Sequence, residues 1–269
     1  MLYLQRYSKA LNMKFRNLTL MSLIVCAMTA CGSGQNDYEI FPIQDNESPR
    51  MMGGNIFPDA PDSLLAELGL QEGIPASVCA FLVKTDGKEI LFDAANGAQD
   101  SQLIPVLTSL ETAAEDIDYI FITHMHGDHI GGLLKDGEAV FSNAVIYINK
   151  VEYDAWMAME ERQSASLRNI CNAYGDRVKT LTLEDELPCG IEAVEAYGHT
   201  PGHTAFRLGD ALIAGDVMHG TALQAKYPEY SAGFDMDKEM SVKTRRAILK
   251  MAEEGVKVYG MHFPAPYHL

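Results

Sequence analysis

Three histidines and an aspartate lie within six residues of the segment Thr-His-Met-His-Gly-Asp-His. His124, His126, Asp128 and His129 directly follow the apolar run of residues 118–123. Polar side chains crowded at the end of a buried strand each need a partner, and a divalent metal ion supplies one. Imidazole and carboxylate ligands suit Zn²⁺, and also Fe, Mn, Co or Ni. The segment therefore predicts a metal site.

Further side chains of the same kind occur later in the chain. His199 and His203 belong to the turn Gly-His-Thr-Pro-Gly-His, just before the apolar residues 204–208. Asp216 and His262 each follow a short apolar run. Because the loops at strand ends of a layered fold gather at one edge, we expect these side chains to join the first set.

The order H-x-H-x-D-H, then histidine, aspartate and histidine, resembles the ligand pattern of the metallo-β-lactamase superfamily. The resemblance extends from about residue 52 to the C-terminus. It implies seven ligands for two divalent metal ions, most often zinc: His124, His126 and His203 for one ion, Asp128, His129 and His262 for the other, and Asp216 bridging both. His199 then orients a ligand. The implied reaction is hydrolysis by a metal-bridging hydroxide, with Asp128 also passing a proton to the leaving group.

Within that superfamily, Asp216 distinguishes the chain from true β-lactamases, which usually lack a bridging aspartate there. The segments 215–219, 227–228, 234–237, 244–246 and 260–264 resemble the branch of methyl parathion hydrolase and certain N-acyl-homoserine lactonases. This resemblance implies a small ester-like substrate such as a lactone. It also implies that His219, Tyr227 and Phe234 line the substrate pocket. Members of that branch usually continue for a couple of strands after the final histidine, whereas seven residues follow His262 here.

Two other reactions on the same scaffold fit the motif. A glyoxalase II-type thioesterase usually carries a C-terminal helical region with basic contacts to glutathione, which makes it the weaker interpretation. A persulfide dioxygenase of this scaffold uses a single iron, so a metal count separates it from a two-metal hydrolase. A binding module without catalysis is disfavoured because no expected ligand is missing.

Charge restricts the partners. The 269-residue chain has a formal net charge of −16, and the four basic residues before Cys31 lie in a stretch without acids. The remainder therefore has 17 basic against 37 acidic residues. Such a surface repels phosphate backbones, so we expect a small-molecule substrate and no nucleic acid.

The first 31 residues have the pattern of a targeting segment. Lys14 and Arg16 precede an apolar run over residues 18–28, too short to span a bilayer, and Ala30-Cys31 then resembles a bacterial lipobox. We predict a signal peptide over residues 1–31, acylation of Cys31, a tether and lead-in over residues 32–60, and a hydrolase domain over residues 61–269. The protein would be exported and lipid-anchored in the cell envelope. The alternatives are an ordinary cleaved signal peptide ending near Ala30 and a true start at Met13.

Strand and helix patterns alternate through the domain. Residues 78–84 and 89–93 flank Asp86-Gly87, a hairpin signal, and residues 118–123 and 144–149 have the composition of strands buried on both faces. Later strands are expected at residues 191–196, 204–208, 211–214 and 256–259, and the main helices at 102–110, 151–173 and 237–254. The predicted fold is α/β, an αββα sandwich of two mixed sheets flanked by helices.

Overall fold

The computed structural model describes residues 38–46, 48 and 50–269. The expected signal peptide, with Cys31, lies outside these residues, so export and lipidation stay predictions. Among the described residues, no helix has the length and hydrophobicity that crossing a bilayer requires.

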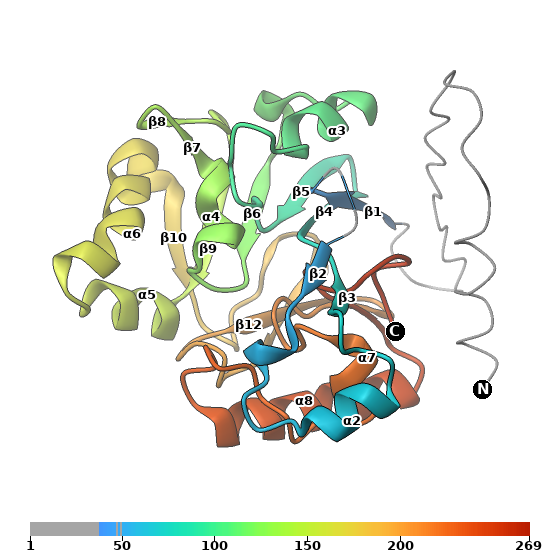
Figure 1. Ribbon diagram of the computed structural model, residues 1–269. Coiled ribbons are helices and arrows are strands. Elements are labelled where there is room, and N and C mark those ends of the chain that lie inside the picture. Colours follow the sequence, from blue (N-terminus) through green and yellow to red (C-terminus); the bar gives the residue numbers. More distant parts are fainter. Residues whose placement is uncertain (1–37, 47, 49) are drawn as a thin grey trace.

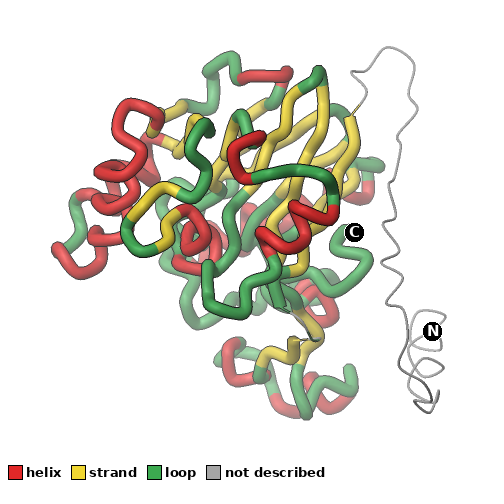
Figure 2. Tube along the Cα trace, turned by 90° about the horizontal axis from the view of Figure 1, so that it is seen from above, coloured by secondary structure: helices red, strands yellow, loops and turns green. Residues whose placement is uncertain are grey.

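The larger sheet has six strands in the order β1-β4-β5-β6-β9-β10. Their bounds are β1 Tyr38–Gln44, β4 Cys79–Thr85, β5 Lys88–Phe92, β6 Tyr119–Ile122, β9 Val145–Asn149 and β10 Val178–Leu181. β1, β4 and β5 pair antiparallel, and the rest of the sheet is parallel. Asp86 and Gly87 join β4 to β5 with positive φ at both residues, as the hairpin signal predicts. The strands of this sheet run side by side in Figure 2.

The smaller sheet has four strands in the order β11-β12-β13-β14. Their bounds are β11 Glu192–Glu195, β12 Thr204–Leu208, β13 Ala211–Ile213 and β14 Lys257–Tyr259. The pairings are antiparallel except for β13 with β14. Two short ribbons complete the described strands: β2 Arg50–Met52 with β3 Ile74–Ala76, and β7 Leu134–Lys135 with β8 Glu138–Ala139.

Aromatic side chains fill the space between the two sheets. Phe206 of β12 lies against Phe92 of β5 and Phe121 of β6, with ring centroids 5.7 and 5.1 Å apart. Such pairs add to the free energy gained from burying the rings. The two sheets therefore pack face to face.

Helices cover both outer faces of this pair of sheets. Their bounds are α2 Asp62–Glu67, α3 Leu103–Ser109, α4 Gly127–Ile130, α5 Lys150–Met157, α6 Glu161–Tyr174, α7 Thr221–Gln224 and α8 Lys238–Glu253. Leu107 of α3 and Ile170 of α6 are buried against the larger sheet, and Ile248 of α8 against the smaller one. Figure 1 shows α3 above the sheets, α6 to their left and α8 below them. The predicted αββα sandwich of two mixed sheets is confirmed.

The lead-in differs from its expected form. Residues 38–44 form β1 at the edge of the larger sheet, so the folded domain begins before residue 61. Tyr38, Ile40 and Ile43 are buried there. Pro42 lacks a backbone N–H, which an edge strand tolerates. The pairing partner, β4, is distant in sequence, so the composition of this segment predicts a tether and does not indicate the strand.

Candidate metal centre

Four loops bring the metal-type side chains together between the two sheets. One loop follows β6 and leads into α4, one precedes β12, one follows β13 and one follows β14. Gly215, in the loop after β13, has φ +54, and a Cβ there would lie 2.6 Å from Nε2 of His203. Only glycine fits so close an approach of the loop to the buried rings beneath it.

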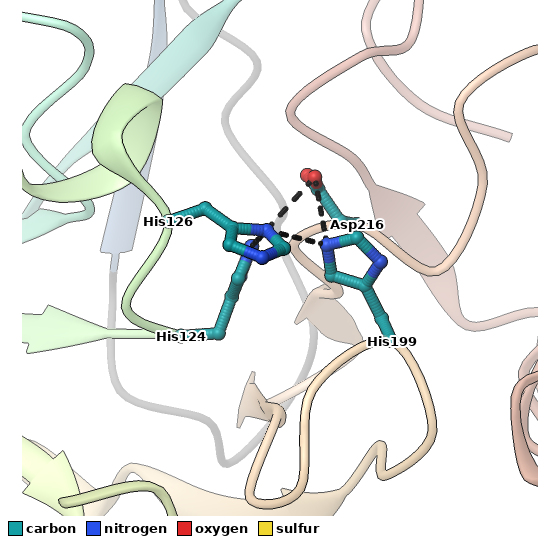
Figure 3. Close-up of side chains that lie close together, drawn as sticks. All are labelled: His124, His126, His199 and Asp216. Carbon is teal, nitrogen blue, oxygen red and sulfur yellow. Dashed lines mark hydrogen bonds and ion pairs between the residues drawn. The ribbon is translucent and has the colours of Figure 1, made fainter. Parts of the chain in front are cut away.

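The first group consists of His124, His126, His199 and Asp216, whose ligand-type atoms lie within 4.8 Å of one another. Figure 3 shows the three rings and the carboxylate converging from three loops. Nδ1 of His126 lies 3.0 Å from Nε2 of His124 and 2.9 Å from Nε2 of His199. Oδ2 of Asp216 lies 3.4 Å from Nε2 of His199.

The second group consists of Asp128, His129 and His262, which also face Asp216. Nε2 of His262 lies 3.1 Å from Oδ2 of Asp216 and 3.6 Å from Oδ2 of Asp128. Nε2 of His129 lies 3.1 Å from Oδ1 of Asp216, although neither atom forms a hydrogen bond of acceptable geometry. Asp216 therefore stands between the two groups.

The sequence predicts His203 as a ligand and His199 as an orienting residue, whereas the structure places His199 in the first group and His203 outside it. Nε2 of His203 accepts a hydrogen bond from the backbone N–H of Asp216 at 3.3 Å, which turns this ring beneath the loop. His203 immediately precedes β12, whereas His199 lies four residues earlier in the turn and belongs to the first group; both rings are buried. His199 is thus the histidine of this turn that the structure brings to the cluster.

The protonation states of the groups suit a cation. Burial lowers the pKa of His124 well below its ordinary value and that of His126 to about 4, so both rings are neutral at pH 7. Burial disfavours charge on Asp216 and His129, but their mutual attraction holds the pKa of Asp216 well below, and that of His129 well above, the ordinary values. His129 is therefore protonated beside the ionised Asp216, and metal binding would release that proton. The neutral rings of His124 and His126 and the ionised carboxylate are donors that suit a divalent metal ion.

Buried atoms without partners support the same interpretation. Nε2 of His129 and Oδ1 of Asp216 make no hydrogen bond among the described residues, although both are buried. They face each other as a charged pair at 3.1 Å without a hydrogen bond. Two divalent cations would satisfy both atoms together with the neighbouring nitrogens. The residues present therefore fit divalent metal ions.

The opposite nitrogen of three of these rings is fixed by an acceptor. Nδ1 of His129 lies 2.8 Å from Asp93, Nδ1 of His199 lies 2.8 Å from Asp235, and Nδ1 of His262 lies 2.8 Å from the carbonyl of Ser77. Such contacts fix the orientation of a metal-binding imidazole. None of these three acceptors is predicted from the sequence. The signal at Asp93 was an aspartate ending an apolar run, as at Asp216.

Two of the three expected pocket residues lie beside the groups. Nε2 of His219 lies 3.1 Å from Oδ2 of Asp216, and burial lowers the pKa of His219 to about 4. The ring of Phe234 lies 4.5 Å from that of His219 and 6.0 Å from that of His199. Tyr227 packs instead with Leu223 in the apolar cluster under α2.

An αββα sandwich with histidines and aspartates gathered between its sheets has the architecture of metallo-β-lactamases. The profile of the metallo-β-lactamase superfamily matches residues 74–260. The chain belongs to that superfamily.

The names of individual relatives describe hydrolases of small molecules. The chain is 25% identical over 169 residues to an N-acyl homoserine lactonase of Bacillus sp, covering 60% of this chain and 62% of the lactonase. It is 26% identical over 137 residues to a hydroxyacylglutathione hydrolase of Xanthomonas euvesicatoria pv. vesicatoria (strain 85-10), covering 51% of this chain and 44% of that protein. The match thus spans about three fifths of the length of the lactonase, or less than half for the second relative.

Solved structures match over more of the chain. The hydrolase AbOPH, of the beta lactamase superfamily, superposes with a TM-score of 0.76 at 27% identity, covering 90% of this chain and 92% of its own. AidC, described as a dizinc quorum-quenching lactonase in complex with a product, gives a TM-score of 0.78 at 26% identity, with 87% and 90% covered.

Proposed function

We propose that this chain is a metal-dependent hydrolase that binds two divalent cations and hydrolyses a small ester-like substrate such as a lactone. The observation that carries the proposal is the position of Asp216. One carboxylate, 3% exposed, lies within 3.4 Å of ring nitrogens from both groups. A shared carboxylate of this kind suits two neighbouring ions.

The ligands follow from the distances. His124, His126 and His199 would hold one ion, Asp128, His129 and His262 the other, and Asp216 both. Nitrogen-rich donor sets favour zinc. When bound, such ions lower the pKa of water and polarise a carbonyl oxygen.

Residues around the groups would act on the substrate. The carboxylate of Asp128 is 34% exposed, and this opening leaves it accessible to a leaving group that needs a proton. The ring of Phe234 covers His219 and His199 and would contact an apolar part of the substrate. AbOPH supports a hydrolase, and AidC supports a lactone substrate and two zinc ions.

A thioester is the second candidate substrate. The hydroxyacylglutathione hydrolase from Xanthomonas matches half of this chain, 51%, which keeps glutathione thioesters in consideration. Both substrates present a carbonyl carbon to the same pair of groups, so only turnover separates them.

One experiment tests the proposal. Metal content is measured on the purified protein, and the same sample is assayed with acyl-homoserine lactones, aryl esters, phosphotriesters, β-lactams and glutathione thioesters. We expect two divalent ions per chain, turnover of lactones, and loss of both turnover and metal uptake in His126→Ala. One iron per chain, or an active His126→Ala protein, would overturn the proposal. An Asp128→Asn protein that keeps two metals and full kcat would remove the proton-transfer role.

A further inference from the structure

A buried carboxylate on α5 belongs to neither group. Glu152 is 1% exposed and accepts four hydrogen bonds, two at each oxygen. Oε1 accepts from the backbone N–H of Met125 at 2.9 Å and from Nε1 of Trp156 at 2.6 Å. Oε2 accepts from the hydroxyl of Thr200 and the backbone N–H of Gly202, both at 2.8 Å. Since all four partners donate, the carboxylate is fully paired without a proton of its own.

The two oxygens of Glu152 reach two different loops. Met125 lies between His124 and His126 in the loop after β6, whereas Thr200 and Gly202 follow His199 in the loop before β12. His126 and His199 bring those loops together in the first group, with ring nitrogens 2.9 Å apart. Glu152 therefore connects the segments whose separation determines that distance.

The loop before β12 packs closely against helix α5. A Cβ on Gly202 would lie 2.2 Å from the backbone nitrogen of Glu152. The backbone of the loop therefore packs directly against the backbone of α5. Trp156, one turn further along α5, donates to Glu152 and sets its ring edge-on to that of His126, with centroids 5.8 Å apart. At the start of the helix, Asn149 donates to the hydroxyl of Thr204 at 2.8 Å. Helix α5 is thus fixed to both loops at several points.

The second group has other supports. His129 is oriented by Asp93 and His262 by the carbonyl of Ser77, and none of the four hydrogen bonds of Glu152 involves these residues. We propose that Glu152 is a positioning residue that sets the geometry of the first group selectively. This rests on the proposed function only in that the first group holds a metal ion.

The test compares two carboxylates on one helix. Glu152→Gln keeps the volume but turns one acceptor into a donor that faces N–H or O–H donors. Asp154→Asn is the matched control, because Asp154 is exposed and pairs with Lys150 on the surface. The full chain is freed of metal, and the two Zn²⁺ dissociation constants are measured by competition with a chromophoric chelator. We expect Glu152→Gln to weaken the binding of one of the two Zn²⁺ ions about 10–100-fold and to leave the dissociation constant of the other unchanged. The control should match the wild type.

Two further measurements separate positioning from misfolding. Thr200→Val removes a single donor and keeps Glu152, so it should weaken the binding of the same Zn²⁺ ion by a smaller factor. Thermal unfolding of the metal-free proteins checks that each variant is folded. A Glu152→Gln protein that binds both ions as tightly as wild type would overturn the proposal, and so would an equal loss of both equivalents. Wild type that binds fewer than two ions contradicts the proposed function instead, whatever the variants do.

Discussion

The first group is oriented by side chains from helix α5 and from the loop before α8, whereas the second is oriented by residues next to strands of the sheets. His199 of the first group is held by Asp235, which precedes α8, and its loop is held by Glu152 of α5. In the second group, Asp93 directly follows β5 and Ser77 lies between β3 and β4. Strands in a sheet are held on both sides by their neighbours. The second group is therefore supported by residues that adjoin paired strands.

The support of the first group also depends on a buried ion pair. Arg245 of α8 is 1% exposed and lies 3.3 Å from Oδ2 of Asp235. Its guanidinium also donates to the carbonyls of Val217 at 2.9 Å and Pro228 at 2.7 Å, in the segment that follows Asp216. A single side chain thus holds both the acceptor of His199 and the loop beyond Asp216. Metal binding at the first group can therefore be weakened by substituting a distant residue that contacts no ligand.

The largest effect is expected where the two groups meet. Asp216→Asn keeps the volume but removes the charge that both groups face, so both metal ions should be lost and turnover should fall to background. Metal per chain after dialysis and kcat/KM on the best substrate measure this. If one ion stays bound with wild-type affinity, Asp216 is not shared and the two groups are independent.

Much of the fold and most of the site could be predicted from the sequence. The run His124 to His129 indicates a metal because local spacing alone crowds the four side chains. The Asp86-Gly87 hairpin follows from turn chemistry, and both were found where expected. These features depend on neighbours in the chain.

The features that were missed depend on distant contacts. Which of His199 and His203 faces the cluster depends on how the turn packs beneath Gly215, and spacing does not encode this. Glu152 and Arg245 look like ordinary polar residues of amphipathic helices. Their burial follows only from the loops that close over them.

A smaller effect should come from the buried ion pair. Arg245→Met leaves Asp235 without its cation, so the metal-free protein should lose about 3–5 kcal/mol of unfolding free energy, as for other broken buried pairs. Zn²⁺ binding at the first group should weaken about 10–100-fold because His199 loses its fixed acceptor. Chelator competition and denaturant unfolding measure the two effects.

Two matched variants sharpen this prediction. Arg246 is exposed beside Arg245, so Arg246→Met should change neither quantity. Asp93→Asn replaces the charged acceptor of His129 with a neutral amide and should weaken the second group instead. If Arg245→Met and Asp93→Asn weaken the same equivalent, the division of the site into two separately supported groups is wrong.

The smallest effect concerns the substrate side of the first group. Phe234 is 45% exposed, and its ring contacts His219 and His199, but no ring contact links it to His129 or His262. Phe234→Ala should leave both zinc affinities unchanged and raise KM about threefold to tenfold, as the loss of ~1 kcal/mol of apolar contact implies. Ile104→Ala on α3, where Ile104 is 41% exposed, is the control and should leave KM unchanged. A fall in kcat at constant KM would show instead that the ring acts on His199 or His219. The first group would then depend on its open side as well as on its helices, and the contrast with the second group would widen.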